Sequence, residues 1–173
     1  STIYCMGSSV PMASGMVLSG VSRPVFAFIG DSTLYHNGLL GLINAANNKI
    51  NVNVILGENS VTAMTGFQPH PGTGKTLEGQ ETTPINVPKL AESMGISYRV
   101  VNPYDIQQCR EALEAAVKEE GPSLIVSSMP CYLLSSRRGQ KVFEPKEVKV
   151  NPEICNGCKI CINDFGCPAI SFD

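Results

Sequence analysis

The chain reads VFAFIGDST at residues 25–33, an apolar run that passes directly into a Gly-Asp-Ser turn. A continuous run rich in aromatic and β-branched residues predicts a strand that is buried on both faces of a sheet. A second run of this type follows at residues 52–56. Between the two, residues 38–47 carry leucine, isoleucine and alanine at helical spacing, which predicts a helix. The three segments together therefore predict a β–α–β unit.

The rest of the first 130 residues or so continues the alternation of strands and helices. We expect strands at 98–101 and 123–128, and helices at 87–94 and 106–119. Asp105 is placed to cap the last helix. Its expected buried face consists of Ile106, Cys109, Leu113, Ala116 and Val117. Repeated units of this kind predict an α/β fold with a parallel sheet and right-handed crossovers.

Polar residues follow the first two expected strands. Gly30, Asp31 and Ser32 come after the first, and Asn59 follows the second within a long Gly- and Pro-rich loop at residues 57–86. Because ligands of parallel sheets bind at the carboxyl ends of strands, Asp31 and Asn59 could together hold Mg²⁺ on a diphosphate. The alternative is an ordinary strand-to-helix turn in which Asp31 is only an N-cap. From these residues alone both interpretations remain open.

Four of the seven cysteines lie close together near the C-terminus: Cys155, Cys158, Cys161 and Cys167, with proline after the last. Thiolates at this spacing are typical of a [4Fe–4S] cluster, and zinc is the competing interpretation. Charged residues at 138–150 predict a linker before this segment. The odd, clustered cysteine count disfavours a disulfide framework and favours a reducing compartment, so we expect a cytoplasmic protein.

Composition excludes several classes of protein. The 173 residues have a net charge of −2, with 6% aromatic residues and no Trp, which disfavours a nucleic-acid-binding surface. No apolar run approaches the roughly 20 residues of a membrane span, and no signal peptide is visible. We expect the chain to be part of a longer protein, since it has no initiator Met.

Several of these motifs resemble those of thiamine-diphosphate enzymes. Asp31 and Asn59 match their Gly-Asp-Gly…Asn motif, with Ser32 in the place of the last glycine. Met6-Gly7 before a helix resembles their Gly-x-Met-Gly segment. The run AMTGFQPHPGTG at residues 63–74 is similar to one family in particular, the α subunit of indolepyruvate:ferredoxin oxidoreductase. The segments GPS at 121–123 and PC at 130–131 share this similarity.

The resemblance implies a thiamine-diphosphate-binding domain at residues 1–143 and a ferredoxin-like iron–sulfur segment at 144–173. Magnesium would be held by Asp31, Asn59 and the carbonyl of Val61. The four clustered cysteines would hold the [4Fe–4S] cluster. The implied cofactor-binding residues are Met6, Gly7, Gly30, Asp31, Ser32, Asn59, Val61 and Thr62.

The resemblance also implies an activity: oxidative decarboxylation of 2-oxo acids, with arylpyruvates such as indolepyruvate favoured, to acyl-CoA and CO₂. Coenzyme A, ferredoxin and a second, β-type subunit in a hetero-oligomer would be the partners. The activating glutamate of such enzymes lies on another domain, so no catalytic residue is assigned here. A non-redox thiamine-dependent decarboxylase and an electron-transfer module with a vestigial α/β domain remain alternatives. His36 and His70 flank the proposed cofactor loops, either for substrate or as plain hydrogen-bonding residues.

Overall fold

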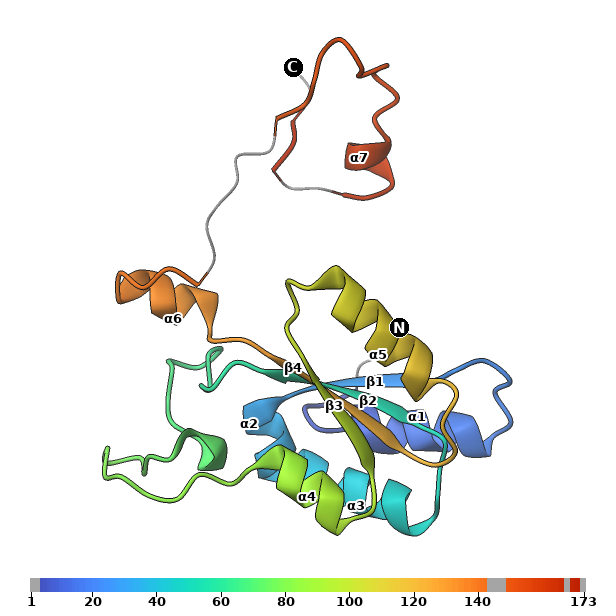
Figure 1. Cartoon of the computed structure of the whole chain (residues 1–173), viewed down its shortest axis with the longest axis vertical. Coiled ribbons are helices and arrows are strands. Elements are labelled where there is room, and N and C mark those ends of the chain that lie inside the picture. The colour runs from blue at the N-terminus through green and yellow to red at the C-terminus, as the bar shows by residue number, and fades with distance from the viewer. Residues whose placement is uncertain (1–3, 143–148, 167–168, 172–173) are drawn as a thin grey trace. The chain divides into compact units, whose positions relative to one another are not determined.

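The computed structural model describes residues 4–142, 149–166 and 169–171. These fall into two compact units, Ser1–Val142 and Phe143–Asp173 (Figure 1). The sequence places the domain boundary after residue 143. That position, and residues 143–148 of the expected linker, lie outside the described part of the chain.

The first unit is built on one sheet of four parallel strands in the order β1-β2-β4-β3. The strands are β1 Phe26–Gly30, β2 Asn53–Glu58, β3 Ser97–Val101 and β4 Ser123–Ser128. Gly30 at the end of β1 lies opposite Gly57 of β2, and Glu58 lies opposite Ser128 of β4. Three carboxyl ends therefore meet at one edge of the sheet, as the predicted α/β fold with a parallel sheet requires.

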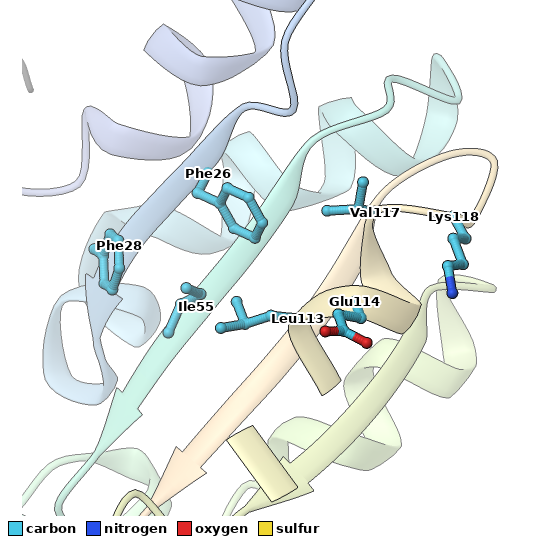
Figure 2. A pocket seen from close by; sticks show the side chains of 7 residues that line it. All are labelled: Phe26, Phe28, Ile55, Leu113, Glu114, Val117 and Lys118. Carbon is cyan, nitrogen blue, oxygen red and sulfur yellow. The ribbon is translucent and has the colours of Figure 1, made fainter. Parts of the chain in front are cut away.

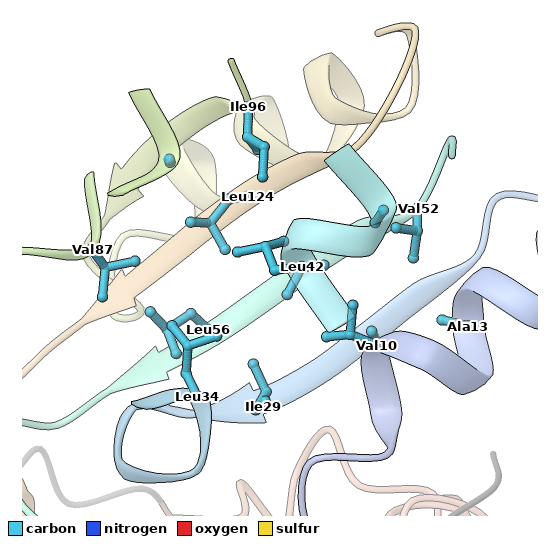
Figure 3. Packing of buried hydrophobic residues seen from close by; sticks show 14 of the residues in the cluster. Val10, Ala13, Ile29, Leu34, Leu42, Val52, Leu56, Val87, Ile96 and Leu124 are labelled. Atoms are coloured by element: carbon cyan, nitrogen blue, oxygen red, sulfur yellow. The ribbon is translucent and has the colours of Figure 1, made fainter. Parts of the chain in front are cut away.

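Helices lie on both faces of this sheet. Figure 1 shows α3 and α4 on one face and α5 on the other. The helices are α1 Ser9–Leu18, α3 Leu39–Asn47, α4 Val87–Ser93, α5 Ile106–Ala116, α6 Tyr132–Arg137 and, in the second unit, α7 Ile160–Asn163. The main core lies between the sheet and the helices α1, α3 and α4, where Leu42, Leu56 and Leu124 are almost completely buried (Figure 3).

Helix α5 differs from its expected form in two ways. It ends at Ala116 rather than at residue 119, and Ile106 and Val117 are 83% and 43% exposed rather than part of the buried face. The helix packs on the sheet chiefly through the small side chains Ala112 and Ala116, which lie towards its C-terminal end. Asp105 does cap the helix, because its carboxylate accepts a hydrogen bond from the Gln108 N–H.

The chain turns helical directly at the end of β1, earlier than the sequence predicts. A short helix α2, Asp31–Thr33, leads into a π-helix η1, Leu34–Gly38, and then into α3. Gly38 does not begin the helix; it allows the π-helix to approach β1, since a Cβ there would lie 2.2 Å from Ile29 Cδ1. Strand and helix are thereby joined without a loop, and Asp31 is fixed at the junction.

Part of one sheet face is left uncovered by the helices of the described residues. Phe26 and Phe28 of β1 and Ile55 of β2 line an apolar groove of about 670 Å³ beside α5 (Figure 2). Phe28 is 69% exposed, whereas parallel sheets are usually covered on both faces.

In the described ranges, no helix has the length and apolar character needed to cross a membrane.

Candidate metal and cofactor site

Asp31 is the centre of the carboxyl edge of the sheet. Its side chain is buried, and Oδ2 accepts hydrogen bonds from the backbone N–H groups of Asn59 and Ser60, both at 2.9 Å. Its other oxygen, Oδ1, accepts one from Ser32 N–H at 2.7 Å. Gly30, not Asp31, occupies the N-cap position of α2. The carboxylate instead joins the end of β1 to the turn after β2, so the plain N-cap interpretation is wrong.

The turn after β2 is shaped to meet that carboxylate. Ser60 has a φ of +60°, in the left-handed region that a serine seldom adopts. The side chain of Asn59 stabilises the turn, because its Oδ1 accepts a hydrogen bond from Val61 N–H at 3.1 Å. Thr62 then returns to the first strand end, where its hydroxyl donates to Ser32 Oγ at 2.9 Å. Five of the residues predicted to bind cofactor or metal are thus brought together.

The donor set of this turn suits a hard divalent cation. Oδ1 of Asp31 and Oδ1 of Asn59 each accept one hydrogen bond from the chain, which leaves a lone pair on each oxygen. Carboxylate and amide oxygens are ligands that Mg²⁺ and Ca²⁺ prefer. Val61, whose carbonyl is the third expected ligand, lies in the same turn and is buried. The residues present therefore fit a magnesium ion.

A second part of the site comes from the turn before α1. Met6 and Gly7 line a cavity of about 210 Å³ together with Gly30 and Thr33 of the β1–α2 junction. Asn37 of the π-helix holds this turn, because its amide donates a hydrogen bond to the Met6 carbonyl at 3.0 Å. Gly7 has a φ of +84°, and a Cβ there would lie 1.7 Å from Asn37 Oδ1, so only glycine fits. The role of Asn37 has no counterpart among the sequence-based expectations.

The long loop after β2 contributes a buried histidine. His70 Nε2 lies 3.1 Å from Asp31 Oδ2, and the His70 ring stacks on Tyr35 with centroids 5.4 Å apart. Burial, and then the negative charges of Glu58 and Asp31, raise the pKa of Tyr35 to about 12. Sequence reasoning placed His70 beside a cofactor loop but found neither its contact with Asp31 nor Tyr35. Neither residue belongs to a periodic pattern that could have shown it.

The same loop also forms a small hairpin next to the site. Thr62 N–H donates to the Gln68 carbonyl at 2.9 Å, and Phe67, next to Gln68, has a φ of +64°. The guanidinium of Arg137 in α6 lies 4.9 Å from the centroid of the Phe67 ring. The hairpin thus connects the turn at Thr62 to the helix that follows β4.

The cysteine segment presents no comparable arrangement among its described residues. Cys155, Cys158 and Cys161 are exposed and free, and Cys167 lies outside the described residues. Within the described ranges, no three His, Cys, Asp or Glu side chains are grouped to hold a metal ion. The iron–sulfur cluster expected at these cysteines stays a prediction.

Comparisons with known proteins show which families and proteins the chain resembles. Residues 1–127 match the family described as thiamine pyrophosphate enzyme, C-terminal TPP binding domain. The indolepyruvate oxidoreductase subunit IorA of Pyrococcus horikoshii is 42% identical over 99% of this chain, and that of Archaeoglobus fulgidus is 35% identical over 98%. The chain covers 29% and 27% of those relatives, respectively. The resemblance found in the sequence is therefore confirmed.

Similar folds occur among solved structures. A 2-oxoglutarate:ferredoxin oxidoreductase from Magnetococcus marinus matches 73% of this chain and 46% of its own, with a TM-score of 0.64 and 18% identity. A putative thiamin diphosphate-dependent enzyme from Mycobacterium smegmatis matches 71% of this chain and 22% of its own, with a TM-score of 0.53 and 23% identity. At these identities the likeness concerns the fold alone.

Proposed function

This chain belongs to the thiamine pyrophosphate enzymes, matching their C-terminal TPP-binding domain, and from that premise we propose that residues 1–143 grip the diphosphate of thiamine diphosphate through Mg²⁺. The observation that carries the proposal is that the two oxygens of Asp31 are hydrogen-bonded differently. Oδ2 is occupied by donors from the turn after β2, while Oδ1 keeps a lone pair for a cation. These hydrogen bonds fix the carboxylate, and the remaining lone pair of Oδ1 is the expected contact with the ion.

Bound thiamine diphosphate supplies the nucleophilic carbon that decarboxylation of a 2-oxo acid requires. The protein's own residues orient it. Asp31 and Asn59, with the Val61 carbonyl, would hold the ion and therefore the diphosphate. The turn at Met6-Gly7 lines the same small cavity as Gly30 and would present its backbone to the ring system of the cofactor. Ser32 and Thr62, joined by a hydrogen bond, keep the two strand ends at a fixed separation.

We further propose that the whole protein is a ferredoxin-dependent 2-oxo acid oxidoreductase with a preference for arylpyruvates. The names of its relatives support this: indolepyruvate oxidoreductase subunit IorA, and the 2-oxoacid:ferredoxin oxidoreductase subunit beta of a Sulfolobus species, 29% identical over 84% of this chain. Coenzyme A would take the acyl group, and ferredoxin the electrons. The naming of these relatives as subunits supports a hetero-oligomer with a second, β-type subunit.

The four clustered cysteines are proposed to hold a [4Fe–4S] cluster at residues 144–173, on the path of the electrons. Free thiols and this ligand set also support a cytoplasmic location. A non-redox thiamine-dependent decarboxylase would share the magnesium site but would have no use for these cysteines. An electron-transfer module with a vestigial α/β domain would have no use for the carboxylate of Asp31.

Calorimetry on the full 173-residue chain tests the cofactor site. Thiamine diphosphate should bind with Mg²⁺ and much more weakly with EDTA, and Asp31→Asn should lower its affinity by a factor of about 10–100. The matched control is Asp105→Asn, the same chemical change at the cap of α5, which should leave the affinity unchanged because Asn caps as well as Asp. Equal affinity in wild type and a folded Asp31→Asn chain would contradict the proposal.

A further inference from the structure

His70 is the one histidine of the chain that is buried, and both of its ring nitrogens face defined groups. Its side chain is 4% exposed. The Gly72 N–H donates a hydrogen bond to Nδ1 at 3.1 Å. Since Nδ1 acts as an acceptor it carries no proton, and the ring proton therefore lies on Nε2.

That proton is directed to the carboxylate of Asp31. Nε2 lies 3.1 Å from Asp31 Oδ2, and the side chains of both residues are 4% exposed. The approach is at ion-pair distance but without hydrogen-bond geometry, and within the described residues Nε2 has no hydrogen-bond partner. Oδ2 already accepts the N–H groups of Asn59 and Ser60, so the Nε2–H group adds a third polar contact to this oxygen.

Tyr35 limits how the histidine ring can move. The two rings stack with an interplanar angle of 27°. The Tyr35 hydroxyl donates to the Ile85 carbonyl at 2.6 Å, near the far end of the long loop. His70 is thereby held between the π-helix and the loop that carries it. Its Nε2 faces Oδ2 of Asp31, whereas Oδ1 is the oxygen proposed to bind the metal.

We propose that His70 is a positioning residue for the metal site: Nε2–H faces Asp31 Oδ2 beside the two backbone donors and helps hold the carboxylate so that Oδ1 faces the cation. The inference rests on the proposed magnesium site at Asp31. His70 is not itself a ligand, because Nδ1 is used by Gly72 N–H and Nε2 carries the proton. It also ties the middle of the loop at 57–86 to the first strand end, so that loop and metal ligand are positioned together.

Two substitutions separate this role from simple packing. His70→Gln places an amide donor near the position of Nε2 and gives up the acceptor for Gly72 N–H. His70→Asn keeps an acceptor near the position of Nδ1 and gives up the donor to Asp31. Both lose the ring that stacks on Tyr35, so their effects on packing are matched. His36→Asn, at an exposed histidine of the π-helix, is the control for the substitution itself.

The measurement is the binding of Mn²⁺, followed by its electron paramagnetic resonance signal, to the full chain with saturating thiamine diphosphate. We expect His70→Asn to weaken Mn²⁺ binding by about tenfold or more, and His70→Gln to stay within about threefold of wild type. His36→Asn should bind as wild type does. Melting temperatures, measured without metal, should fall by similar amounts in the two His70 variants.

Each result has a distinct meaning. If both His70 variants bind Mn²⁺ as wild type does, or both weaken equally and in step with their melting temperatures, His70 only packs and the inference is wrong. If Asp31→Asn binds Mn²⁺ as tightly as wild type, the proposed metal site fails, whatever the His70 variants do. Should His70→Asn not fold, the variant Tyr35→Phe replaces it, because it removes the hydrogen bond that holds the Tyr35 ring, and with it the stacked His70, to the Ile85 carbonyl. Tyr35→Phe should then weaken Mn²⁺ binding measurably, and unchanged binding would overturn the inference.

Discussion

The carboxyl edge of the sheet and the cysteine segment are both candidate metal sites, but they are prepared to different degrees. At the first, Asp31 is buried and accepts three backbone hydrogen bonds. At the second, the described cysteines Cys155, Cys158 and Cys161 are exposed and not grouped. The comparison teaches that a fold with a core can fix a candidate ligand by its own hydrogen bonds, whereas a short segment without one is expected to take its order from a bound metal.

The largest effect should come from the cysteine segment. Anaerobic reconstitution with iron and sulfide should give a brown protein and protect residues 150–166 from proteolysis, because cluster binding and folding of the segment are coupled. Cys158→Ala should abolish nearly all iron uptake while leaving the melting temperature of the α/β unit unchanged. Iron analysis, visible absorbance and limited proteolysis make the measurement.

Cys109→Ala is the control for the loss of one thiol, since Cys109 lies in α5 of the other unit. It should take up iron as wild type does. A colourless protein with stoichiometric zinc would contradict the iron assignment. A fall in the melting temperature of the α/β unit with Cys158→Ala would break the comparison itself, because the two regions would then not be independent.

A smaller effect is expected at Tyr35, whose ionisation reports how far the fold shields the carboxyl edge of the sheet from water. Its pKa rises from 10.0 to about 12 in the fold, so the unfolded chain ionises first. The stability that Tyr35 contributes is complete below pH 10 and is lost as the pH rises from 10 to 12. A shift of two units corresponds to about 2.7 kcal/mol, and the half-buried phenol should contribute roughly 1–2 kcal/mol.

Denaturant unfolding of wild type and Tyr35→Phe at about pH 9 and about pH 11.5 tests this. The Phe variant lacks the hydrogen bond to Ile85 and should be less stable at the lower pH, but its stability should fall less between the two values. Parallel losses in both proteins would show that the fold does not shield the Tyr35 phenol from water and that its pKa is not raised.

The smallest effect concerns an ion pair of the same unit that lies outside the site. The hydrogen bond from Arg99 in β3 to Glu119 lowers the pKa of Glu119. The contribution is therefore present above the ordinary glutamate pKa and is lost as the pH falls below it. Because both side chains are partly exposed, Glu119→Gln should cost about 0.5–1 kcal/mol near pH 7 and less near pH 3.

Thermal unfolding at the two pH values measures this difference. Thiamine diphosphate affinity should not change in Glu119→Gln, because Glu119 plays no part in the proposed site. A loss of affinity would mean that the preparation of the carboxyl edge depends on distant electrostatics rather than on local hydrogen bonds.

Sequence reasoning found the strands and the meeting of Asp31 with Asn59, because both depend on where apolar runs end. It missed His70's contact and Tyr35, because these depend on how a loop without periodicity folds back over a π-helix. It missed Asn37 because the partner of Asn37, Met6, lies 31 residues earlier in a separate turn. Ile106 was expected in the core since its spacing fits a helical face, but spacing cannot show how far a helix extends over its sheet. The left-handed Ser60 had no signal, since glycine is the residue that usually marks such a turn.

The π-helix at Leu34–Gly38 has a consequence for how the sequence can change over time. A π-helical turn holds one residue more than the α-helical path would need, as if a single codon had been inserted. Removing one residue here would restore an ordinary α-helical turn, in which successive side chains lie about 100° apart, and would change the directions in which the side chains of this segment point. Tyr35 and Asn37 could not then both keep their partners, Ile85 and Met6. Substitutions in this segment should therefore be tolerated far more readily than any change in its length.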